Sequence, residues 1–189
     1  MSWFGNSDSP SALERLRTPF FCAKCGIEHT GLMDLAAFAP DPWPHPESYG
    51  PNSALRTDND FLSEDFCVLQ GRYFMIRSVL ELPVHGVAEK FGFGCWTTLS
   101  RENFDKYVEG FDNGEYSDWG PWSGYLCNKL ADYIGDKPEP VLVYPQHDRQ
   151  RPTLRIVDDA HRLAVDQEYG ISPERLFEIL EFYGHAPPA

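Results

Sequence analysis

The sequence contains little that points toward nucleic acid or membranes. Lys and Arg number 16 against 29 Asp and Glu, which gives a formal net charge of −13. A surface of this sign repels phosphate backbones and anionic lipid, so we expect no nucleic-acid partner and no membrane association. No apolar run approaches the roughly 18 residues that a membrane span needs. The charge remains compatible with a protein partner, and with a basic one in particular.

An export signal and a disulfide framework are also missing. The stretch MSWFGNSDSPSALERLR has no basic start followed by an apolar core, so we expect no secretory signal there. The five cysteines are an odd number and lie scattered along the chain. Both observations favour a reduced compartment, so we expect a cytoplasmic protein whose cysteines stay unpaired.

Common catalytic motifs are absent as well. The chain contains no Gly-x-Ser-x-Gly, no P-loop and no His-Glu-x-x-His. The stretch GFGCWT lacks the third glycine and the following helix of a dinucleotide-binding fingerprint. We therefore expect an accessory or binding protein rather than an enzyme.

The length of 189 residues suits one domain. We expect residues 1–18 to form a flexible N-terminal arm with at most a short helix, and residues 19–186 to form a single α+β domain. Within it, residues 19–51 carry a Cys-x-x-Cys stretch and the segment APDPWPHPESYGP, whose five prolines exclude regular helix or sheet. We expect residues 19–51 to pack against the rest of the domain.

Hydrophobic periodicity predicts an antiparallel sheet with flanking helices. Strands are predicted by period-two patterns at 66–84 (a hairpin that turns at Gly71), 91–100, 141–146 and 153–158. Helices are predicted by capping residues and spacing at 101–111, 162–170 and 173–183, the last two as a C-terminal helical hairpin. Short helical turns are predicted within 31–40 and 122–134.

Several segments, taken together and in order, resemble the bacterial family called domain of unknown function 2199. They are FCAKCGIEH, EDFCVLQGRYFMIRSVLELPV, FGFGCWTTLSRENF, WSGYLCNKLADY, QRPTLRIVDDAH and HRLAVDQEYGIS. The chain departs from the family where Arg162 replaces the proline of His-Pro-Leu and where Cys95 replaces a common valine. The resemblance implies one fold unit after Thr18, and it implies no activity and no catalytic residue.

The stretch FFCAKCGIEH, residues 20–29, is the strongest chemical signal. Two thiolates on a tight turn can bind one tetrahedral metal ion, and Gly26 allows the backbone conformation that such a turn needs. We predict a structural zinc with Cys22 and Cys25 as ligands, His29 as the third and Cys67 as the best distant fourth. The alternatives are a metal-free turn and a redox pair, and the latter usually opens a helix after a strand.

Two further pairs of residues are candidates for binding. Trp119 and Trp122 lie in a loop rich in Gly and Asp and would suit a protein interface, or they could cover one face of the sheet. Arg151 and His161 would mark an enzyme site between the sheet and the C-terminal helices, which is the alternative to a binding protein. In the structural alternative, Arg151 forms ion pairs and His161 caps the following helix.

Overall fold

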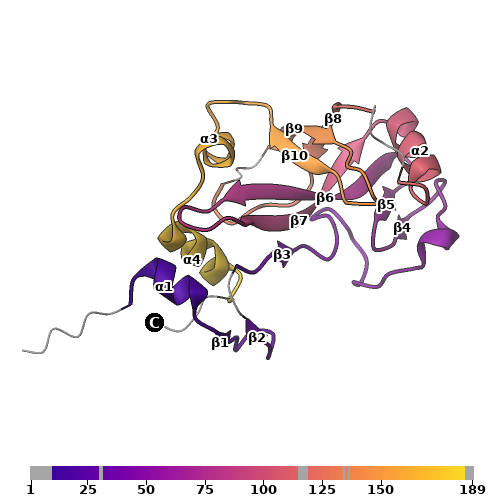
Figure 1. Ribbon diagram of the computed structural model, residues 1–189. Coiled ribbons are helices and arrows are strands. Elements are labelled where there is room, and N and C mark those ends of the chain that lie inside the picture. Colours follow the sequence, from indigo (N-terminus) through magenta and orange to yellow (C-terminus); the bar gives the residue numbers. More distant parts are fainter. Residues whose placement is uncertain (1–9, 30–31, 115–118, 134, 136, 186–189) are drawn as a thin grey trace, which may run out of the picture.

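The computed structural model describes residues 10–29, 32–114, 119–133, 135 and 137–185 (Figure 1). The strands are β1 (Phe20–Phe21), β2 (Glu28–His29), β3 (Leu35–Ala36), β4 (Phe61–Leu62), β5 (Phe66–Leu69), β6 (Tyr73–Pro83), β7 (Lys90–Leu99), β8 (Trp122–Leu126), β9 (Glu139–Tyr144) and β10 (Thr153–Ile156). The helices are α1 (Ala12–Arg17), α2 (Arg101–Gly110), α3 (Arg162–Tyr169), α4 (Pro173–Phe182) and the short 3-10 helix η1 (Asn52–Ala54).

Strands β6 to β10 form a closed barrel. The long strands β6 and β7 pair in antiparallel register from Phe74↔Leu99 to Pro83↔Lys90. Strands β8, β9 and β10 follow around the ring, and β10 returns to β6 in parallel, with Leu154 opposite Leu80. The predicted α+β class is therefore correct in its content, but the predicted antiparallel sheet closes on itself.

Each long strand changes partner along its length, which is what allows the ring to close. The first half of β6 pairs with β5, whereas its second half pairs with β10. Strand β7 likewise contacts β3 first and β8 near its end. The crossing of β8 over β7 is close at Gly124, where a Cβ atom would stand 2.2 Å from the carbonyl oxygen of Thr98. Only glycine fits this crossing.

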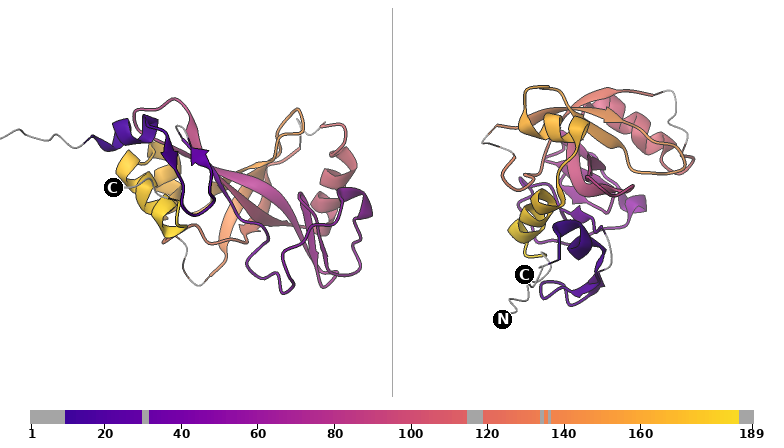
Figure 2. Two further views of the ribbon diagram at one scale, coloured as in Figure 1. Left: turned by 90° about the horizontal axis from the view of Figure 1, so that it is seen from below. Right: turned by 60° about the vertical axis from the view of Figure 1, so that its left-hand side comes forward.

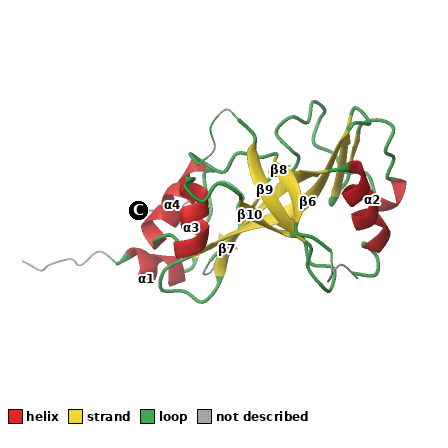
Figure 3. Ribbon diagram, turned by 90° about the horizontal axis from the view of Figure 1, so that it is seen from above, coloured by secondary structure: helices red, strands yellow, loops and turns green. Residues whose placement is uncertain are grey.

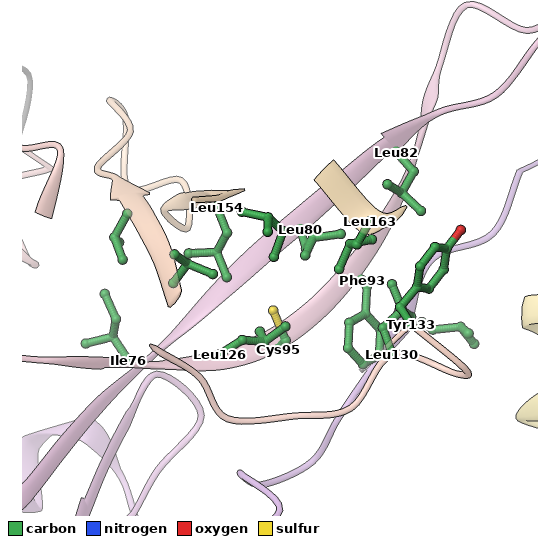
Figure 4. Close-up of a cluster of buried hydrophobic side chains, with 14 of the residues drawn as sticks. Ile76, Leu80, Leu82, Phe93, Cys95, Leu126, Leu130, Tyr133, Leu154 and Leu163 are labelled. Atoms are coloured by element: carbon green, nitrogen blue, oxygen red, sulfur yellow. The ribbon is translucent and has the colours of Figure 1, made fainter. Parts of the chain in front are cut away.

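The hydrophobic core fills the barrel and continues under the helices. Figure 4 shows its centre, where side chains of β6, β7, β8 and β10 meet. The alternation predicted for β6 is present, because Ile76, Leu80 and Leu82 are fully buried in this core. Helix α2 covers one end through Phe104 and Tyr107, whose rings contact Phe66.

The two C-terminal helices do not form the predicted hairpin. Helix α3 lies against β6 and β10, whereas α4 lies beside α1 at the end of the barrel (Figures 1 and 3). The connection is anchored to the end of β6, since Ile171 N donates to Pro83 O at 2.8 Å and His85 N donates to Ile171 O at 2.9 Å. This anchor separates the helices and gives each its own packing partner.

Two other local predictions differ from the structure. Residues 31–40 and 122–134 contain the strands β3 and β8 instead of helical turns, because pairing with β7 and β9 outweighs local propensity. Residues 10–18 contain the short helix that the prediction allowed: α1 has a capping box between Ser11 and Glu14, and its Leu16 is buried in the core. Residues 1–9 of the predicted arm lie outside the described part.

Candidate metal centre

The N-terminal Cys-x-x-Cys stretch folds as a tight turn on a two-stranded ladder. Strands β1 and β2 pair Phe20 with His29. Inside this ladder, Cys22 N donates to Ile27 O at 2.9 Å, and Gly26 N donates to Cys22 O at 2.8 Å. Gly26 has φ of 71°, a left-handed conformation that glycine adopts without strain. The turn therefore presents the two cysteines and His29 on one short piece of backbone.

A fourth side chain comes from the other end of the chain. Helix α4 ends with two hydrogen bonds, from Gly184 N to Glu181 O and from His185 N to Leu180 O, both at 2.8 Å. This is a Schellman motif, in which a left-handed residue follows the helix and fixes the position of the next one. Gly184 supplies that conformation with φ of 77°. His185 is thus held against the Cys-x-x-Cys turn.

The ligand atoms of Cys22, Cys25, His29 and His185 all lie within 4.8 Å of one another. Cys22 Sγ is 3.4 Å from His185 Nδ1, and Cys25 Sγ is 3.1 Å from His29 Nε2. Around a tetrahedral ion with metal–sulfur bonds of ~2.3 Å and metal–nitrogen bonds of ~2.0–2.1 Å, sulfur and nitrogen ligands lie about 3.5 Å apart. The four residues could therefore hold a metal ion with small side-chain adjustments.

The electrostatics of the group favour its deprotonated forms. The pKa of the Cys22 thiol is lowered, chiefly because the backbone N–H of Cys25 faces its sulfur. The pKa of His185 is lowered by burial first and then by His29 and Lys24. Metal ligands must be free of protons, so both shifts prepare the group to bind an ion. Cys22 is buried, whereas Cys25 is exposed to solvent.

Comparison with known proteins identifies the family. The model of the family described as "Uncharacterized protein conserved in bacteria (DUF2199)" matches residues 21–171. The chain belongs to this family. A search of curated proteins and a search of solved structures found no match. The matched region of this DUF2199 protein includes Cys22, Cys25 and His29, and it ends before His185.

Sequence reasoning missed His185 in this DUF2199 protein. A glycine beyond the last helix was predicted, and a histidine directly after such a glycine is the available signal. A glycine followed by histidine predicts the backbone conformation at the end of the helix. It does not predict which residues pack against that end. Only the packing of α4 beside α1 brings His185 to the cysteines.

The structure does not bring Cys67, the predicted fourth ligand, to this group. Cys67 lies in β5 opposite Met75 and is fully buried in a small cluster with Trp96. Burial raises the pKa of its thiol to about 12. The hairpin of β5 and β6 turns at the α2 end of the barrel, whereas β1 and β2 lie below α4 (Figures 1 and 2). The hairpin therefore carries Cys67 away from the turn.

The two tryptophans have different environments in this DUF2199 protein. Trp122 is 8% exposed and contacts Tyr107 of α2, with ring centroids 6.4 Å apart. Trp119 is 36% exposed and lies over Trp122 at 6.5 Å. Both line a hollow of about 610 Å³ beside α2. Trp122 therefore belongs to the core, and Trp119 forms its solvent-facing edge.

Arg151 and His161 do not converge on one site. Arg151 precedes β10 and contacts Glu64 at 2.9 Å and Asp65 at 3.3 Å. His161 follows β10 and caps α3, where its Nδ1 accepts a hydrogen bond from Leu163 N at 3.1 Å. Each residue thus has the structural role given as the alternative to catalysis: an ion pair for the arginine and a helix cap for the histidine.

Proposed function

We propose that this protein is a zinc-binding protein whose metal joins the two ends of the chain. The observation that carries the proposal is the meeting of two thiols and two imidazoles within 4.8 Å. Thiolate ligands select soft or borderline ions, and imidazole suits zinc among them. A set of two Cys and two His is a common structural zinc site in proteins.

A structural role is better supported than a catalytic one. A catalytic zinc has three protein ligands and keeps its fourth position for water or substrate. Here four side chains are available to fill the tetrahedron, and no carboxylate belongs to the group among the described residues. Glu28 beside it is exposed on β2. A general base of the kind that accompanies a catalytic zinc is thus missing from this part of the chain.

A redox role for the cysteine pair has less support. Redox-active Cys-x-x-Cys motifs open a helix after a strand, where the helix dipole stabilises the thiolate. In this chain the motif lies in the turn between the short strands β1 and β2. The backbone N–H groups around Cys22 lower its pKa, as they also do in metal-binding turns.

The biological role that follows is that of a binding or accessory protein in a reducing compartment. All five cysteines are free thiols, which suits the bacterial cytoplasm. None of the helices in the described part is long and apolar enough to cross a membrane. The net charge of −13 argues against nucleic acid and favours a protein or small-molecule partner.

The test is metal analysis of protein purified without a metal-affinity tag. We expect about one zinc per chain, and loss of zinc in Cys22→Ser, Cys25→Ser and His185→Ala. Cys127→Ser and His147→Ala are the matched controls, because neither residue belongs to the group, and both should retain zinc. Wild-type protein that is folded and metal-free, and that does not take up added zinc, would contradict the proposal.

A further inference from the structure

A second feature of the molecule, independent of the metal centre, is an open hollow of about 1050 Å³. It lies between the β5–β6 turn, the end of β7 and the strands β8 and β9. Its surface is mainly apolar, with contributions from Phe74, Leu99, Leu126 and Val141. Tyr73 and Tyr125 line it and are 46% and 53% exposed. An apolar hollow of this size is typical of sites for small molecules.

Cations line this hollow although the chain as a whole is strongly acidic. Arg72, Lys129 and Lys137 all contribute to the lining and are exposed. Within the described residues, none of the three has an ion pair with a carboxylate. Elsewhere on the surface, Lys90 and Lys106 pair with glutamates at 2.8 and 2.9 Å. Three described cations without a carboxylate partner thus line this apolar hollow, and Arg56 and Arg149 are further ones outside it.

The described lining contains one acid, Asp41, against these three cations. Asp41 accepts hydrogen bonds from Asn128 Nδ2 at 2.9 Å and from Lys129 N at 3.0 Å, so both of its carboxylate oxygens are engaged by the protein. Ser100, which caps the N-terminus of α2, also belongs to the lining. The positive end of a ten-residue helix therefore adds to the cations there.

We propose that this hollow binds a small amphipathic anion, a molecule with an apolar chain and one carboxylate head. The apolar surface would hold the chain, and Arg72, Lys129 or Lys137 would pair with the head. A small ligand is favoured over an acidic protein or an anionic bilayer for a physical reason. Screening limits electrostatic effects to about 8 Å at physiological salt, so a small anion senses the local cations. A large anionic partner would also face more of the chain, whose net charge is −13.

The test compares three probes of equal chain length on zinc-loaded full-length protein: decanoate, decan-1-ol and decyltrimethylammonium, all below their aggregation concentrations. Calorimetry should give decanoate the lowest Kd, about tenfold below the other two, as expected for one or two partly exposed ion pairs. Amide chemical-shift changes caused by decanoate should map to β8 and the β5–β6 turn.

The triple variant R72Q/K129Q/K137Q should bind decanoate about tenfold more weakly and decan-1-ol unchanged. Arg149→Gln is the matched control, since Arg149 is an exposed cation outside the hollow, and it should bind like wild type. Equal affinity for all three probes, unchanged decanoate binding in the triple variant, or shifts that map elsewhere would overturn the proposal. Binding of a glutamate-rich peptide without binding of decanoate would also overturn it, in favour of a protein partner.

Discussion

Cys22 Sγ lies 3.4 Å from Nδ1 of His185, although 163 positions separate the two residues in the chain. A metal ion bound by both would close a loop that contains the whole barrel. Cross-links that close long loops have the largest effect on the entropy of the unfolded chain in the loop-closure model. The contact of α1 with α4, where Arg15 lies 4.9 Å from the ring centre of Phe177, supports the same joining of the two ends.

Chelation should therefore destabilise the wild-type protein but not a variant that lacks the metal. We expect EDTA to lower the Tm of wild-type protein and to leave the already lower Tm of His185→Ala unchanged, because that variant has no zinc to lose. His147→Ala should respond to EDTA like wild type. Thermal melts of each protein with and without EDTA measure these changes in Tm. An equal EDTA effect on wild type and His185→Ala would mean that His185 is not a ligand.

Gly184 should be required for metal binding although it is not a ligand. Its φ of 77° lies in the region that costs an L-residue about 1–2 kcal/mol. Gly184→Ala should lose about 1 kcal/mol of stability and bind zinc more weakly, because the end of α4 no longer holds His185 in place. Gly135→Ala is the control, since a Cβ at this glycine meets no atom within 4 Å. Competition with a chromophoric chelator measures the affinity, and wild-type affinity in Gly184→Ala would refute the prediction.

The two tryptophans should differ in their contribution to stability. Trp122→Ala removes a ring that is 8% exposed and packs against α2, and it should cost about 3–5 kcal/mol. Trp119→Ala removes a ring that is 36% exposed and should cost about 1 kcal/mol. Urea denaturation of the two variants measures both values. Equal losses would show that Trp119 is as much a part of the core as Trp122.

Arg77 should hold the proline-rich segment against the barrel. Its guanidinium is buried at 5.0 Å from the ring of Trp96 and donates to the carbonyl oxygens of Ala37 at 2.9 Å and Phe38 at 2.8 Å. It also donates to the hydroxyl of Tyr49. A lysine cannot stack and reach two carbonyls at once, so Arg77→Lys should cost about 1–3 kcal/mol.

The effect of Arg77→Lys should be local. Hydrogen exchange should quicken in residues 37–50 and stay unchanged in α3. Arg72→Lys is the control at an exposed arginine of the same hairpin, and it should stay within about 0.5 kcal/mol of wild type. Uniform quickening across the barrel would show that Arg77 supports the whole core instead of this segment.

Local signals in the sequence predicted much of the fold. The Ser100 cap, the turn at Gly71 and the glycine after the last helix are each decided by neighbouring residues, and all are present. The closure of the barrel depends on β10 lying parallel to β6, a contact between residues more than 70 positions apart in the sequence. Periodicity reports which face of a strand is buried but not which strand lies beside it.

The residues of the candidate metal site could likewise be predicted only in part from the sequence. Cys22, Cys25 and His29 lie within eight residues, so their spacing alone predicted a group. The fourth partner depends on where α4 packs, and proximity in the sequence carries no information about it. Cys67 was the best candidate by residue type, but its position on β5 buries it at the other end of the barrel. Residue chemistry without tertiary contacts therefore selected a fourth residue that the structure does not bring to the group.

The most direct measurement is the X-ray absorption spectrum of the zinc-loaded wild-type protein at the zinc edge. Our account predicts a shell of two sulfur ligands at ~2.3 Å and two nitrogen ligands at ~2.0–2.1 Å, with imidazole scattering beyond it. His185→Ala, which we expect to lose the metal, should give no zinc-edge signal above background. A shell with three sulfurs, or one made of oxygen and nitrogen only, would contradict the assignment of Cys22, Cys25, His29 and His185 as the metal centre.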